Sequence, residues 1–270
     1  PTVIRSGRYD SLVIGTSTAR LLQPKQLEGT FGGRFANLAL NSGTAWEQMR
    51  LVRLFREEVK RRRTLIVALD HVWCAADADT QRITKRGFPE WMFDHNPWND
   101  IPNMLNARTI EIAGRRIGHA LGLVKARWPH NGYEVFVSPE RDYDLKRARQ
   151  HIWGPTGPKP DDTATAAVQE KQQALAPETA HSFPALAWLN EIVDAGQGWQ
   201  RVVLLITPVH RAALPAAGTP EGAREAACKA VMTAIARRNG VALVDFRLPS
   251  PITRRDENYW DSLHYRVPIA

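Results

Sequence analysis

Five short apolar runs, separated by segments with helical patterns, constrain the fold of this chain more than any other feature. The run at residues 64–69 is apolar throughout after its first residue, which is typical of a central parallel strand covered on both faces. Strands that alternate with helices predict a parallel sheet between helical layers, joined by right-handed crossovers. We therefore expect a three-layer α/β/α fold with a parallel five-stranded sheet, its strands lying at residues 12–14, 35–40, 64–69, 201–206 and 241–246.

The length and composition of the chain suit one α/β domain that contains an inserted segment. The chain has 270 residues, of which 43% are hydrophobic and 24% charged, enough for a single large core. Residues 77–160 depart from the alternation of strands and helices, with an aromatic, proline-rich stretch and then a largely helical segment over 101–126. We expect a single domain over residues 1–270, with 77–160 as an inserted, mainly helical lobe over the site. Trp91 and Trp98 at the tips of this lobe would suit stacking on sugar rings, or would form its own small core.

Other helices are expected from local signals. Thr44 begins one, because Glu47 three residues later completes a capping box. Proline and glycine near residues 154–160 indicate a hinge or an exposed linker. Helices returning to the sheet are expected at residues 163–174, 183–195 and 221–238.

The charge balance narrows the classes of partner. A formal net charge of +8 favours acidic surroundings such as anionic glycans, a membrane surface or nucleic acid. Nucleic acid is an unlikely partner, because the sequence has no zinc-finger spacing, Walker loop or aromatic-basic RNA motif. No apolar run approaches the roughly 20 residues of a membrane helix. The chain begins at Pro1 rather than a methionine, which leaves room for a membrane anchor outside it, so its localisation stays unknown.

The two cysteines and the eight histidines give no sign of a metal or cofactor. Cys74 and Cys228 are far apart in the sequence, and we expect two buried thiols rather than a disulfide. No pair of histidines stands at helical spacing beside a carboxylate, and no Cys-x-x-Cys occurs. We expect neither a metal nor a cofactor.

The stretch at residues 10–20 has the pattern of a strand, a tight turn and a helix. Gly15 ends the apolar run, and Thr16 and Ser17 follow it. Such a turn places a side chain at the carboxyl end of a buried strand, beside free backbone N–H groups at a helix N-terminus. Ser17 is therefore a candidate nucleophile. The alternative is that Ser17 merely caps a helix over residues 18–22.

A second motif near the C-terminus favours the catalytic interpretation. Asp261 stands three residues before His264, where its carboxylate can accept the imidazole Nδ1–H and leave Nε2 free to take a proton from a serine. Ser17, Asp261 and His264 together predict a Ser-His-Asp triad that works through an acyl-enzyme.

These blocks resemble the SGNH/GDSL hydrolase superfamily. Gly15-Thr16-Ser17 resembles its nucleophile block, Asp261 to His264 its last block, and residues 37–44 its second block. Within this superfamily, the nucleophile block of the chain is similar to the branch whose motif is G-[ST]-S-x-[AV]. Several members of that branch act in bacterial polysaccharide acylation. The resemblance implies a flavodoxin-like fold and an extracytoplasmic or membrane-anchored location. The family's third block, G-x-N-D, is absent, so its asparagine donor has no obvious counterpart.

Several other residues are expected around the nucleophile. The Ser17 N–H and one from Ser42 or Gly43 would form the oxyanion hole, and spacing does not choose between the last two. Possible substrate-lining residues stand at the carboxyl ends of strands, where ligands bind in open α/β sheets: Asp70, His71 and His210. An ionised Asp70 would be a poor oxyanion donor. His71 would otherwise be a histidine at the edge of the core, and His210 a surface-loop histidine.

The sequence therefore predicts a serine ester hydrolase that acts on O-acyl esters, on an acylated carbohydrate or a small ester. Two alternatives stay open. One is a polysaccharide O-acetyltransferase, in which a sugar hydroxyl accepts the acyl group. The other is a non-catalytic glycan-binding protein on the same fold.

Overall fold

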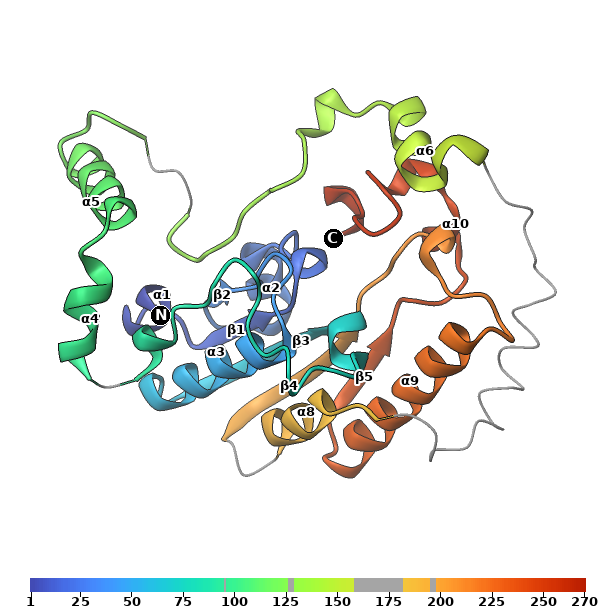
Figure 1. Ribbon diagram of the computed structural model, residues 1–270, viewed down its shortest axis with the longest axis horizontal. Helices are drawn as coiled ribbons and strands as arrows, with labels where there is room; N and C mark the ends of the chain where they lie inside the picture. The colour runs from blue at the N-terminus through green and yellow to red at the C-terminus, as the bar shows by residue number, and fades with distance from the viewer. Residues whose placement is uncertain (95, 126–128, 158–181, 195–197) are drawn as a thin grey trace.

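The computed structural model describes residues 1–94, 96–125, 129–157, 182–194 and 198–270 (Figure 1). Its centre is one five-stranded parallel sheet in the order β2-β1-β3-β4-β5. This order is the one found in flavodoxin-like folds, and the predicted three-layer α/β fold is confirmed. The strands are β1 (Ser11–Ile14), β2 (Phe35–Asn37), β3 (Arg62–Leu69), β4 (Trp199–Ile206) and β5 (Ala242–Asp245).

Helices and short 3-10 turns connect the strands. The predicted capping box at the start of α3 is present, since Thr44 Oγ1 accepts the Glu47 N–H and the Glu47 carboxylate accepts the Thr44 N–H. The helix expected at residues 163–174 lies outside the described residues. The helices are α1 (Thr2–Arg5), α2 (Pro24–Phe31), α3 (Ala45–Glu58), α4 (Pro97–Met104), α5 (Ala107–Ala120), α6 (Leu145–Trp153), α8 (Ala185–Val193), α9 (Pro220–Arg238) and α10 (Pro251–Arg254).

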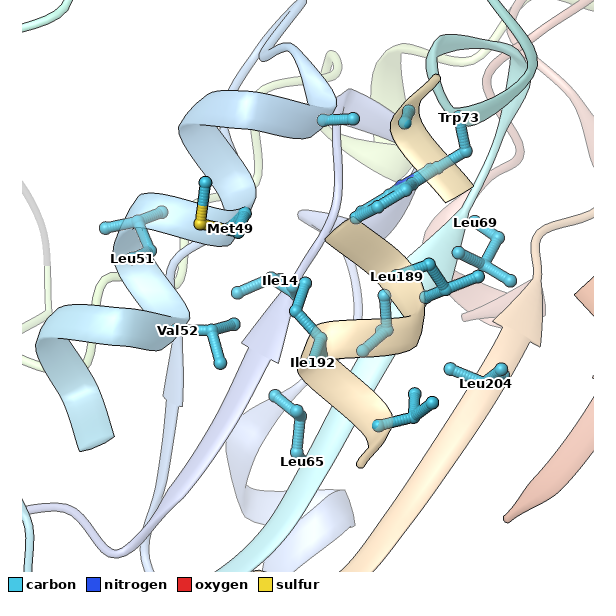
Figure 2. Packing of buried hydrophobic residues seen from close by; sticks show 14 of the residues in the cluster. Ile14, Met49, Leu51, Val52, Leu65, Leu69, Trp73, Leu189, Ile192 and Leu204 are labelled. Atoms are coloured by element: carbon cyan, nitrogen blue, oxygen red, sulfur yellow. The ribbon is translucent and has the colours of Figure 1, made fainter. Parts of the chain in front are cut away.

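The larger part of the core lies between the sheet and helices α3, α8 and α9. Figure 2 shows Ile14 and Leu65 of neighbouring strands facing Val52 of α3 and Ile192 of α8. On the opposite face, a smaller cluster that includes Val13 packs against α2 and the turn after β1. Burial of both faces of β1 and β3 explains why their apolar runs are continuous.

Strand β2 is shorter than the sequence predicts. It ends at Asn37 rather than at residue 40, because the Asn37 side chain accepts the Ala39 N–H at 3.1 Å and turns the backbone. The chain still follows β1, since the Leu38 N–H donates to Val13 O and the Leu40 N–H to Gly15 O. Residues 38–40 therefore lie beside the end of β1, close to the nucleophile turn.

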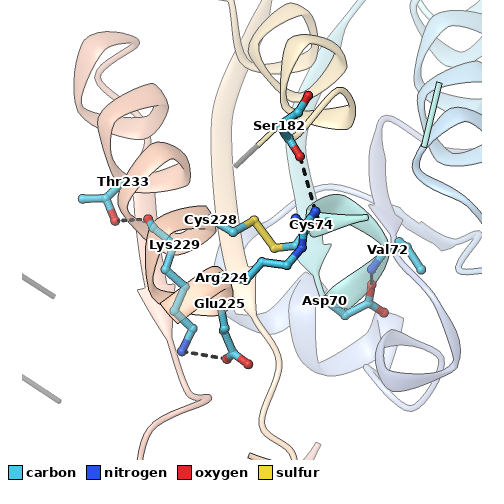
Figure 3. The surroundings of a disulfide bond; sticks show 9 residues. All are labelled: Asp70, Val72, Cys74, Ser182, Arg224, Glu225, Cys228, Lys229 and Thr233. Carbon is cyan, nitrogen blue, oxygen red and sulfur yellow. Dashed lines mark hydrogen bonds and ion pairs between the residues drawn. A yellow bond between two sulfur atoms is a disulfide. The ribbon is translucent and has the colours of Figure 1, made fainter. Parts of the chain in front are cut away.

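The expectation of two free thiols is wrong. Cys74 and Cys228 form a disulfide, with their Cα atoms 5.8 Å apart (Figure 3). Cys74 ends η2 (His71–Cys74), the 3-10 turn that follows β3, and Cys228 lies on α9. Because α9 crosses the sheet next to this turn, the fold brings together two residues that are 154 positions apart.

The described helices within residues 77–160 lie at two ends of the molecule (Figure 1). The segment predicted to be helical over 101–126 divides at Leu105 and Asn106, where the Asn106 side chain caps α5 through the Thr109 N–H. Helices α4 and α5 lie at the left edge of Figure 1, and α6 lies at the opposite end, against the C-terminal segment. Among the described residues, none of the helices combines the length and apolar character needed to cross a bilayer.

Candidate active site

The turn after β1 presents Ser17 at the carboxyl edge of the sheet. Gly15 permits this turn, because a Cβ there would lie 2.7 Å from the Ala19 Cβ and 2.8 Å from the Ala68 Cβ. Ser17 begins η1 (Ser17–Ala19), and the residue at its N-cap is Thr16, whose side chain makes no capping bond. The interpretation of Ser17 as a helix cap is therefore wrong.

Ser17, His264 and Asp261 form a hydrogen-bonded chain. Ser17 Oγ lies 2.8 Å from His264 Nε2, and His264 Nδ1 lies 2.8 Å from Asp261 Oδ2. An ionised carboxylate can only accept hydrogen bonds, so the ring proton of His264 lies on Nδ1, which faces Asp261. Nε2 is then left as the acceptor of the hydrogen bond from the Ser17 hydroxyl. Residues 247 positions apart in the sequence thus meet in the geometry of an activated serine.

The Asp261 carboxylate is held in its ionised form. Burial by itself raises the pKa of Asp261, but hydrogen bonds from the His264 ring and from backbone N–H groups outweigh it and set the pKa below its ordinary value. The backbone N–H groups of Leu263 and His264 donate to Oδ1 at 2.7 and 2.8 Å. These bonds also fix the carboxylate against the imidazole.

The loop that carries Asp261 and His264 is closed on itself and tied to the nucleophile turn. Tyr259 and Tyr265 form an antiparallel bridge, and the Trp260 N–H donates to His264 O at 2.9 Å. The buried Tyr265 hydroxyl donates to Thr18 O, directly after the nucleophile. These bonds therefore hold the loop in position relative to Ser17.

A network of buried polar side chains forms hydrogen bonds with the residues on either side of Ser17. The Thr16 hydroxyl donates to Asp70 Oδ2, and Asp70 Oδ1 accepts the Val72 N–H at 3.2 Å (Figure 3). Thr18 Oγ1 accepts from the Thr207 hydroxyl at 3.1 Å. Asp70, proposed to line the substrate, is 3% exposed and holds the residue before Ser17 instead.

Residues 40–43 form a tight turn next to the end of β1. The Gly43 N–H donates to Leu40 O at 2.9 Å, so it is already used. Ser42 has φ of 57°, the one positive value outside glycine in the described part of the chain. Such a backbone is costly for a serine and is often associated with function. Of the two candidates that sequence left open, Ser42 retains an N–H without an acceptor among the described residues, as does Ser17.

The two other histidines at the sheet edge differ from each other. His71 is exposed in η2, so it is not a histidine of the core edge. His210 is fully buried, and neither the substrate-lining nor the surface-loop interpretation is correct. Its ring packs edge-on between Trp153 and Tyr259, and its backbone N–H donates to Ser262 O at 2.9 Å. His210 therefore holds the catalytic loop in place.

The predicted aromatic tips do not meet the triad. Trp98 is 80% exposed on α4, and Trp91 is half-buried in the 3-10 turn Glu90–Phe93. The excursion reaches the site through a different residue, Phe136, whose ring packs edge-on against the His264 ring at 5.3 Å. An isolated phenylalanine in a loop gives no sequence signal of this contact.

Segment 131–136 connects this aromatic wall to the rest of the site. Asn131 O accepts the Asn37 N–H at 2.9 Å, and Glu134 pairs with Arg20, three residues after Ser17. The Asn37 side chain in turn donates to Ala19 O at 2.9 Å. These contacts join β2, the nucleophile turn and the loop behind Phe136 into one wall.

Within the described residues, no group of three or more His, Cys, Asp or Glu side chains is arranged to hold a metal ion. Comparison of the chain with protein-family models, curated proteins and solved structures gives no match. What the site can do is therefore inferred from its own geometry.

Proposed function

We propose that this protein is a serine ester hydrolase that cleaves O-acyl esters through an acyl-enzyme. One observation carries the proposal: Ser17 Oγ, His264 and Asp261 form a continuous hydrogen-bonded chain with 2.8 Å at each link. The serine lies at the carboxyl edge of a parallel sheet, where open α/β folds bind their ligands.

In the first half of the reaction, His264 Nε2 takes the Ser17 proton while Oγ attacks the ester carbonyl carbon. Asp261 stabilises the resulting imidazolium through Nδ1–H. When the tetrahedral intermediate collapses, the C–O bond to the alcohol breaks and His264 gives its proton to the departing oxygen. In the second half, His264 takes a proton from water while the water oxygen attacks the acyl carbon. The bond from the acyl carbon to Ser17 Oγ then breaks, and His264 returns the proton to Oγ as the acid leaves.

The negative charge on the carbonyl oxygen needs hydrogen-bond donors. The N–H groups of Ser17 and Ser42 are the candidates, since both lack acceptors among the described residues and the Gly43 N–H does not. Each donor of this kind contributes about 3 kcal/mol to the transition state. We propose these two N–H groups in place of the asparagine of the missing family block.

Acylated carbohydrate is the substrate class we favour, and the resemblance to the polysaccharide-acylating branch of the SGNH/GDSL superfamily supports it. The disulfide supports the extracytoplasmic location that this resemblance implies, because disulfides persist in oxidising compartments. In an acyltransferase of the same design, a sugar hydroxyl would replace water as the acceptor.

Hydrolysis of p-nitrophenyl acetate tests the proposal. We expect turnover by the wild-type protein and losses of about 10³-fold or more in Ser17→Ala and His264→Ala. Ser138→Ala and His151→Ala are the matched controls, because both side chains are exposed and take no part in the site. Equal turnover by the Ser17 and Ser138 variants would exclude the triad as the source of activity.

A further inference from the structure

A basic cavity of about 700 Å³ lies between α1, α5 and the loop at residues 129–134, apart from the triad. Its volume is in the range of roughly 300–1,000 Å³ that is typical of ligand pockets. Basic side chains dominate its wall, and six of them form no ion pair in the described part of the chain: Arg8, Arg115, Arg116, His119, Lys125 and His130.

The acidic side chains in this wall do not balance the charge. Glu134 is engaged by Arg20, and Glu111 is the one other carboxylate among the described lining residues. A concave surface lined by one sign of charge concentrates its electric field and attracts oppositely charged ligands. The guanidinium groups of Arg115 and Arg116 can also form bidentate hydrogen bonds, in which two N–H groups donate to the two oxygens of one carboxylate. The cavity is therefore suited to an anionic ligand.

The rest of the wall indicates the kind of anion. Val3, Ile112, Val124 and Pro129 give it aliphatic surface, on which the C–H faces of sugar rings can pack. Aliphatic surface beside free basic groups suits an acidic saccharide, and nucleic acid and an anionic membrane surface are the competing outcomes of the test.

A second cavity adjoins the basic one near the turn that carries the nucleophile. This second cavity, of about 540 Å³, shares Thr2, Val3, Arg20 and Gly132 with the basic cavity and extends to Leu40 and Asn41. The Leu40 N–H donates to Gly15 O, at the turn that presents Ser17. An extended chain lying in both cavities would thus pass from α5 to Leu40 and Asn41, beside the turn that presents Ser17.

We propose that the basic cavity binds an acidic oligosaccharide segment of the substrate, with its anionic groups on Arg115 and Arg116 and the ester delivered toward Ser17. Delivery to Ser17 rests on the proposed esterase function, whereas binding in the cavity does not. The substrate class is accordingly an acylated, anionic polysaccharide.

The test measures binding by calorimetry in the Ser17→Ala protein, with oligogalacturonate as the acidic probe and maltooligosaccharide of equal length as the neutral one. We expect binding of the acidic probe alone, weakened by about tenfold or more in a variant that also carries Arg115→Glu and Arg116→Glu. The matched control carries Lys146→Glu and Arg147→Glu on α6, an exposed basic pair at the opposite end of the molecule. This control should bind like the parent.

Three outcomes would overturn the cavity proposal: no binding of oligogalacturonate, equal loss in both double variants, or tighter binding of oligothymidylate or of phosphatidylglycerol vesicles. Hydrolysis of p-nitrophenyl acetate by the wild-type protein and by the Lys146→Glu and Arg147→Glu control with Ser17 intact separates the two proposals. If both hydrolyse it but the acidic probe does not bind to the Ser17→Ala protein, the cavity proposal fails and the esterase stands. If the probe binds but no variant hydrolyses the ester, the esterase proposal fails.

Discussion

Single residues from distant parts of the chain determine how Ser17 is presented. Gly15 leaves room for the turn, and the Thr16 hydroxyl is held by the buried Asp70. The Asn37 side chain donates to carbonyls of the same turn, including Leu22 O at 2.9 Å. Because each of these groups is buried and paired, the serine is fixed before any substrate arrives.

Asp261→Asn is the most informative change at this scale. The amide keeps the size of the side chain but cannot stabilise the imidazolium or hold the proton on Nδ1, so we expect kcat to fall by about 10³ to 10⁴-fold. Steady-state hydrolysis of p-nitrophenyl acetate measures this loss, with the melting temperature as a check on folding. A loss below about tenfold would mean that Asp261 does not orient His264.

Among the elements, η2 and α9 are joined covalently beside the site. The disulfide ties the end of η2, whose N-cap residue is Asp70, to Cys228 in the middle of α9 (Figure 3). The Arg224 guanidinium strengthens the same junction by donating to Cys74 O and to Ser182 O. The turn that supports Thr16 is thereby anchored to the helical layer.

Removal of the disulfide should destabilise the fold. A cross-link that closes a loop of about 100 residues or more restricts the unfolded chain strongly, and we expect Cys74→Ala with Cys228→Ala to lose about 2–5 kcal/mol of unfolding free energy. Urea denaturation with and without dithiothreitol measures it. The reductant should lower the midpoint of the wild type and leave that of the double variant unchanged. A wild-type midpoint that is insensitive to reduction of the bond would contradict this expectation.

Elements fixed by local pattern were predictable from sequence, and those fixed by distant contacts were not. The five strands and the Thr44 cap follow from apolar runs and a capping box within a few residues. The pairing of Cys74 with Cys228 and the burial of His210 depend on where α9 and the C-terminal segment pack, which no local pattern encodes. The same holds for Phe136, which reaches His264 from a loop.

The triad is an intermediate case. The residue types and the spacing of Asp261 and His264 predicted which side chains would meet Ser17, and the contacts agree. Sequence spacing could not show that the Gly43 N–H is used by the turn, because that bond to Leu40 O depends on the backbone conformation.

At the scale of the whole molecule, the C-terminal segment is held between α6 and the end of β4. Asp256 accepts hydrogen bonds from Arg149 at 2.8 Å and from the Trp153 indole at 3.1 Å. His210 Nε2 lies 3.1 Å from the same carboxylate, while its Nδ1 accepts the Ala212 N–H. The position of the catalytic loop therefore depends on a buried, neutral histidine.

This arrangement predicts a pH-dependent stability. Burial lowers the pKa of His210 more than the neighbouring Asp256 raises it, so the unfolded chain takes up the proton more readily than the folded one. Stability from this group is complete above the unfolded pKa of about 6.5 and is lost as the pH falls toward the folded value. Melting temperatures at about pH 7.5 and pH 5.5 should differ more for the wild type than for His210→Gln. Equal differences would show that His210 does not cause the dependence.

The measurement that tests the central claim most directly is the intact mass of the protein after exposure to a fluorophosphonate, followed by peptide mapping. An activated serine displaces fluoride and retains the phosphonyl group, so we predict a single adduct on Ser17 that is absent from Ser17→Ala and strongly reduced in His264→Ala. Folded protein that stays unlabelled, or that is labelled equally in the His264 variant, would contradict an activated Ser17 and leave the site as a binding surface.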